Sequence, residues 1–157
     1  MRVLVAGIGN IFLGDDGFGV HVVERLAEST PPDGVRFADF GIRGLHLAYE
    51  LLDGYDVLVL VDAIAGRGTP GAVSVIEAEM PTTAPDVLDA HGMTPDVVLG
   101  LLRKLGGTIG KTFVVGCEPV DCSERIGLST AVNASVDQAV DLTRGLLDEI
   151  IDCPAAS

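Results

Sequence analysis

Acidic residues of this chain stand where carboxylates can do chemistry. Asp15 and Asp16 close a glycine-rich turn within VLVAGIGNIFLGDDGFGV, Asp62 ends an apolar run, and His91 lies further along the chain. Adjacent residues of a helix point about 100° apart, so one aspartate is expected to cap the following helix while the other faces a crevice. Asp15 is the expected cap. Asp16, Asp62 and His91 together offer oxygen and nitrogen ligands suited to a borderline divalent metal.

The glycine turn also has features of a nucleotide-binding loop. Gly7 and Gly9 fit the start of G-x-G-x-x-G, and Asp39 stands where such folds place a ribose-binding acid. Phe12, however, occupies the third glycine position, and no G-K-[ST] follows. Asp15 and Asp16 would repel a phosphate at the start of the helix. The turn is therefore expected to face a cation.

Strand and helix patterns alternate along the chain. Strands are predicted over Arg2–Ala6, Val35–Asp39, Val57–Val61, Ala72–Glu77 and Lys111–Gly116, and helices over about Gly17–Ser29, Leu45–Leu52, Thr94–Leu105 and Ser129–Ile151. The connection Ala63–Gly71 is too short for a parallel crossover. Ala72–Glu77 is therefore expected to run antiparallel to the preceding strand, as its hairpin partner.

These elements predict one α/β domain over residues 1–152, followed by a tail at 153–157. The expected architecture is a doubly wound five-stranded mixed sheet with one antiparallel strand and helices on both faces. With the strands in the order 2-1-3-4-5, the first and third strands are neighbours. Asp16 and Asp62 would then meet at one edge of the sheet.

Composition limits the possible partners. A formal net charge of -13 argues against binding to nucleic acid or to an anionic membrane surface. No apolar run reaches the roughly 18 residues of a membrane span, and no secretory signal is visible, so a cytoplasmic location is expected. Cys117, Cys122 and Cys153 form no C-x-x-C pair, which argues against disulfides or a zinc ribbon. Cys117 is expected to be a buried thiol rather than a nucleophile.

The order of several sequence blocks resembles the nickel–iron hydrogenase maturation endopeptidases. The blocks are GIGNIFLGDDGFGV, DFGIRG, VLVDAI, HGMTPDVVLGLL, VVGCEP and ERIGLS, and they cover nearly the whole chain. The resemblance implies an endopeptidase that removes the C-terminal extension of a hydrogenase large-subunit precursor after nickel insertion. It places the family's metal-binding and catalytic residues on Asp16, Asp62 and His91. It places the glycine turn after the second strand on Gly41 and Gly44.

The resemblance further implies that the nickel is carried by the substrate, although other divalent metals would also suit the three ligands. The expected protein is a monomer whose partner is the precursor. Either a metal-bound water or a water activated by a carboxylate would attack the peptide bond. Two alternatives stay open. One is a non-catalytic nickel-binding or assembly protein for the immature large subunit, and the other is a hydrolase or phosphorylase of related architecture.

Overall fold

A computed structural model describes residues 1–80 and 94–152 and contains a single mixed sheet. Its strands are β1 (Val3–Ile8), β2 (Val35–Gly41), β3 (Val57–Ala63), β4 (Val73–Ala78) and β5 (Lys111–Cys117), in the spatial order β2-β1-β3-β5-β4. All neighbours pair in parallel except β4 and β5, which are antiparallel. The predicted five-stranded mixed sheet is confirmed.

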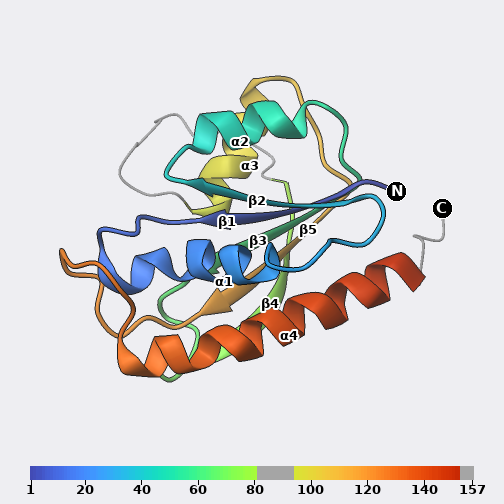
Figure 1. The fold of residues 1–157 in the computed structure, drawn as a ribbon. Helices are drawn as coiled ribbons and strands as arrows, with labels where there is room; N and C mark the ends of the chain where they lie inside the picture. Colours follow the sequence, from blue (N-terminus) through green and yellow to red (C-terminus); the bar gives the residue numbers. More distant parts are fainter. Residues whose placement is uncertain (81–93, 153–157) are drawn as a thin grey trace.

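Helices cover both faces of the sheet (Figure 1). One face packs against α1 (Phe18–Leu26) and α4 (Thr130–Asp152), and the other against α2 (Gly44–Leu51) and α3 (Pro95–Lys104). β1 is buried along its whole length because it lies between these two layers, as its unbroken apolar sequence predicts. The carboxyl ends of β1 and β3 therefore reach the same edge of a rigid sheet.

The prediction that Ala72–Glu77 is the hairpin partner of the preceding strand is wrong. β5 lies between β3 and β4, so the expected order 2-1-3-4-5 is replaced by 2-1-3-5-4. The loop of residues 64–72 only has to span two strand spacings, roughly 10 Å, which an extended loop of that length covers easily. β4 alternates between half-buried and exposed residues, as suits an edge strand, whereas β5 is buried over most of its length.

The helix boundaries follow the predicted signals closely. Thr94 caps α3 by accepting a hydrogen bond from the Val97 amide, and Pro95 takes the first helical position. The predicted first helix is instead preceded by a short 3-10 helix, η1 (Gly14–Gly17), and begins at Phe18. None of the helices within residues 1–80 and 94–152 is long and apolar enough to cross a membrane.

Candidate functional site

The turn after β1 is built by close backbone contacts at its glycines. Gly9 has φ +125°, and a Cβ on it would collide with the carbonyl oxygen of Asp16. A Cβ on Gly19 would collide with the carbonyl oxygen of Val61, so α1 can approach β3 only because Gly19 has no side chain. The glycines of the opening motif thus serve packing between strand and helix. They bring η1 against the end of β3 instead of cradling a phosphate.

Asp16 is half-buried in η1 and points back toward the turn. Its Oδ2 accepts a hydrogen bond of 2.8 Å from the amide of Asn10. This bond fixes the carboxylate at the carboxyl end of β1. The prediction that Asp16 faces the edge of the sheet agrees with this position.

Asp62 lies at the end of β3 with only 3% of its surface exposed. Within the described part of the chain, its Oδ1 is buried and has no hydrogen-bond partner. Burial first, and the charge of nearby Asp16 second, raise the pKa of Asp62 well above the usual aspartate value, and a hydrogen bond from the Ala63 amide opposes them. A buried oxygen without a donor beside a second carboxylate suits an incoming cation, which would favour the ionised form.

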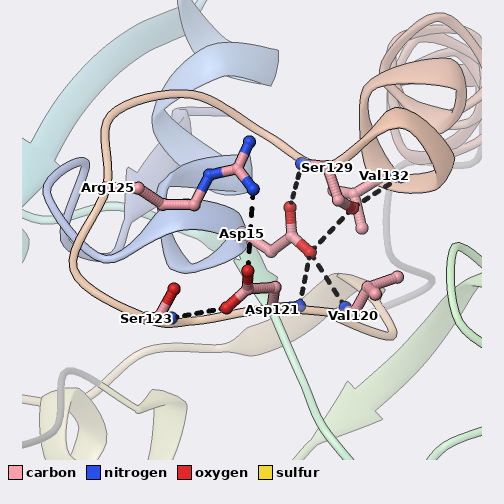
Figure 2. A network of polar contacts seen from close by, with 7 residues as sticks. All are labelled: Asp15, Val120, Asp121, Ser123, Arg125, Ser129 and Val132. Atoms are coloured by element: carbon pink, nitrogen blue, oxygen red, sulfur yellow. Dashed lines mark hydrogen bonds and ion pairs between the residues drawn. The ribbon is translucent and has the colours of Figure 1, made fainter.

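Asp15 does not cap the helix that follows it, contrary to the prediction. Neither η1 nor α1 has a side-chain cap, and the fully buried Asp15 carboxylate turns toward the loop between β5 and α4 (Figure 2). Its Oδ2 accepts hydrogen bonds of 2.9 Å from the amides of Val120 and Asp121 and of 2.8 Å from the Ser129 hydroxyl. Its Oδ1 accepts one of 2.6 Å from the Ser129 amide.

These four bonds tie η1 to a loop more than a hundred residues away. Burial raises the pKa of Asp15, but the hydrogen bonds from Ser129, Asp121 and Val120 outweigh it, so the pKa lies below the usual value. Ser129 also accepts a bond from the Val132 amide and thus joins Asp15 to the start of α4. Asp15 is therefore a structural anion that holds its neighbour Asp16 in place.

Cys122 is a neighbour of the site that the sequence did not point to. Partial burial, then the charges of Asp16 and Asp15, raise the pKa of its thiol, whereas a hydrogen bond from the Asp16 amide lowers it. Cys122 is far from the turn of Asp15 and Asp16 in the sequence, so nothing in the sequence indicates that they are neighbours. Cys117 is fully buried, and burial raises the pKa of its thiol to about 11, in agreement with the prediction of an inert thiol.

The structure brings together two of the three predicted ligands. Asp16 and Asp62 lie near each other, since a Cβ on Gly9 would come within 1.9 Å of the Asp16 carbonyl oxygen and 3.6 Å of Asp62 Oδ1, while His91 falls outside the described residues. His21 and His46 lie on α1 and α2. Within residues 1–80 and 94–152, no three His, Cys, Asp or Glu side chains are grouped so as to hold a metal ion. The described residues thus place two carboxylates close together at the ends of β1 and β3, and whether they bind a metal with His91 stays a prediction.

Comparison with known proteins gives a consistent result. The family model for hydrogenase maturation proteases matches residues 20–145. The chain is 32% identical to the hydrogenase 2 maturation protease of Escherichia coli (strain K12) over 152 residues, which cover 95% of this chain and 92% of the relative.

Solved structures of hydrogenase maturation peptidases are also similar to this chain. The hydrogenase maturating endopeptidase HybD from E. coli superposes with a TM-score of 0.76 at 31% identity, covering 95% of this chain and 93% of that one. The hydrogenase 2 maturation peptidase from a Thaumarchaeota archaeon gives a TM-score of 0.73 at 33% identity, with 94% and 99% covered.

Proposed function

Because this chain belongs to the hydrogenase maturation protease family and is a peptidase, we propose that it removes the C-terminal extension of a nickel–iron hydrogenase large-subunit precursor. The observation that carries the site is the buried Oδ1 of Asp62 beside the carboxylate of Asp16, an oxygen to which no donor among residues 1–80 and 94–152 is hydrogen-bonded. Two carboxylates at the open edge of a sheet offer hard oxygen ligands to a cation that arrives with the substrate.

The nickel of the precursor would be the recognised cation, with Asp16, Asp62 and His91 as its ligands on this chain. Asp16 is held by Asn10, and Asp62 is held by its strand, so both oxygens are in place before the substrate arrives. The metal would position the peptide bond to be cut. Attack by water, activated either by the metal or by a carboxylate, would then complete hydrolysis. The protein would act as a monomer in the cytoplasm.

Incubation with nickel-loaded and nickel-free precursor, followed by intact-mass measurement, tests this function. We expect the extension to be lost only from the nickel-loaded form. Asp16→Asn and Asp62→Asn should abolish cleavage, and so should His91→Ala. Asp33→Asn, which changes an exposed carboxylate in the loop before β2, is the matched control and should cleave at the wild-type rate.

Two outcomes would contradict the proposal. Cleavage of nickel-free precursor at the same rate would remove nickel recognition from the mechanism. A stable complex with nickel-loaded precursor whose C-terminus stays intact would instead support the non-catalytic assembly protein, since the same ligands would serve either role.

A further inference from the structure

A pocket adjoins the carboxylate pair on the side of β2. It has a volume of about 300 Å³ and lies between the turn after β1 and the turn after β2. Its lining includes the buried side chains of Val20 and Phe40 and the more exposed side chains of Phe12 and Ile42. Phe12 is 60% exposed and Ile42 is 65% exposed. Large apolar side chains facing solvent around a hollow are typical of a surface that binds another chain.

The pocket and the carboxylates share one wall. Gly9 and Asn10 line the pocket. The Asn10 amide also binds Asp16, and a Cβ on Gly9 would come within 3.6 Å of Asp62 Oδ1. Because one wall of backbone separates the two sites, a peptide held at the carboxylates can reach the pocket within about two extended residues, at roughly 3.3 Å each.

The charges around the pocket favour a bound peptide that carries a basic residue. The lining includes Glu24 and Asp39, whose carboxylates form no ion pair within the described residues. Arg43 donates hydrogen bonds to the backbone carbonyls of Asp39 and Phe40 and thereby braces the turn. The pocket thus combines apolar walls with a net negative rim.

We propose that this pocket binds an apolar side chain of the precursor's C-terminal extension, within about two residues of the cut bond, next to a basic residue of the same segment. The inference rests on the proposed function. The residues that carry the nickel are expected to lie over Asp16 and Asp62, so the adjoining pocket is left for the segment beyond them. The pocket would let the enzyme distinguish between precursors with different C-terminal extensions. Recognition of nickel alone cannot make that distinction.

Variants of the rim test the apolar part of the proposal. Ile42→Ser should raise KM for nickel-loaded precursor about tenfold and leave kcat within about twofold, because it removes binding area outside the reacting centre. Ile151→Ser makes the same change at an exposed position near the end of α4 and should leave both constants unchanged. Phe12→Ser provides a second variant of the rim.

A double-mutant cycle between the enzyme and the precursor identifies the residue of the extension that binds in the pocket. Each of the first residues after the cut is replaced by serine in the precursor. At one apolar position the replacement should lower kcat/KM for the wild type but cause no further loss with Ile42→Ser. Glu24→Lys should lower kcat/KM for an extension with a basic residue. Asp148→Lys is its control, because Asp148 lies on α4 and lines a different pocket, together with Val57 and Lys111 at the starts of β3 and β5.

The outcomes separate the two proposals. If the wild type neither cleaves nor binds the nickel-loaded precursor, the proposed function fails and this inference fails with it. If the wild type cleaves the precursor while the Ile42→Ser, Phe12→Ser and Ile151→Ser variants behave alike, or no position couples, only the pocket assignment is overturned. If the precursor is bound without cleavage, the same comparisons are made on its Kd and decide the pocket in the same way.

Discussion

Two adjacent aspartates of this chain have opposite environments. Asp15 is fully buried and accepts four hydrogen bonds, whereas the neighbouring Asp16 is half-buried and accepts one from Asn10. A buried carboxylate that is fully satisfied by donors stabilises the folded state in its charged form. The pair thus divides into a residue that maintains the structure and a residue that we propose to bind the nickel of the precursor.

Replacing Asp15 tests the structural half of this division. Asp15→Asn should lower the free energy of unfolding by about 2–4 kcal/mol at pH 7, because an amide cannot accept all four bonds and brings its own donors. Since the pKa of Asp15 is lowered in the folded state, its stabilisation is complete above the usual aspartate pKa. It is lost as the pH falls through the lowered value.

Urea unfolding of wild type and Asp15→Asn between pH 2 and pH 7 measures this effect. The two curves should converge at the acid end. Asp121→Asn is the control, because its carboxylate belongs to the same loop but is 41% exposed, so its replacement should change the free energy of unfolding much less than Asp15→Asn. A difference between wild type and Asp15→Asn that stays constant with pH would contradict the assignment.

Asp62 should show a conflict between function and stability. Its pKa is raised in the folded state, so the wild type loses stability as the pH rises from the usual aspartate pKa to the raised one. Asp62→Asn has no such loss and should be more stable than the wild type at pH 8, while both are alike at pH 3.

Thermal unfolding at the two pH values, combined with the cleavage assay, checks this expectation. The variant should be more stable and inactive at pH 8. If Asp62→Asn is less stable than the wild type at both pH values, the Asp62 carboxylate stabilises the folded state, and the expectation is wrong.

At the scale of the elements, close backbone contacts in the turn from β1 to η1 help to position Asp16. Gly9 combines a left-handed φ with a close approach to the Asp16 carbonyl, and its amide donates to Gly41 in the turn after β2. This turn therefore joins three parts of the site: the helix start, the end of β3 and the pocket wall. Any side chain at residue 9 must displace one of them.

Gly9→Ala is expected to lower the free energy of unfolding by about 3 kcal/mol or more and to abolish cleavage. Gly54→Ala is the matched control, because Gly54 also has a left-handed φ, +94°, but nothing lies within 4 Å of its added Cβ. The control should cost about 1 kcal/mol of backbone strain and leave cleavage unchanged. Equal effects of the two substitutions would mean that strain, and not the collision with Asp16, explains the loss.

The strand order shows where local sequence is insufficient. The alternating residues of β4 and the buried run of β5 were visible, but the short loop after β3 favoured a hairpin with β3. Which strand occupies the inner position depends on how β5 packs between β3 and β4 and under the helices. Such long-range packing leaves no mark in the residues of the loop itself.

The whole molecule carries 23 acidic and only 10 basic side chains, a formal net charge of -13. The described residues form three ion pairs, and each has at least one partner that is well exposed. Surface pairs of this kind contribute little, so repulsion among the acids should dominate the electrostatics of the folded state.

Salt should therefore stabilise this protein. We expect the midpoint of thermal unfolding to rise by about 3–5 °C between 0.05 and 0.5 M NaCl, because the screening length falls below the spacing of the surface acids. Differential scanning calorimetry measures this directly, and Asp148→Lys should reduce the rise. A midpoint that falls with salt would mean that the ion pairs outweigh the repulsion.

The sequence by itself determined the fold class and the elements, because apolar periodicity is encoded in contiguous residues. The strand order typical of that fold class then placed β1 beside β3, and so Asp16 near Asp62. It also argued against a nucleotide-binding loop, through the acids of the turn, Phe12 in the third glycine position and the missing G-K-[ST]. Only the tertiary structure decided that β5 lies inside β4, that Asp15 holds a distant loop, and that Cys122 and the pocket of Phe12 and Ile42 adjoin the site. Each of these depends on which segments pack together across the molecule, and a carboxylate's role is set by the donors that packing brings to it.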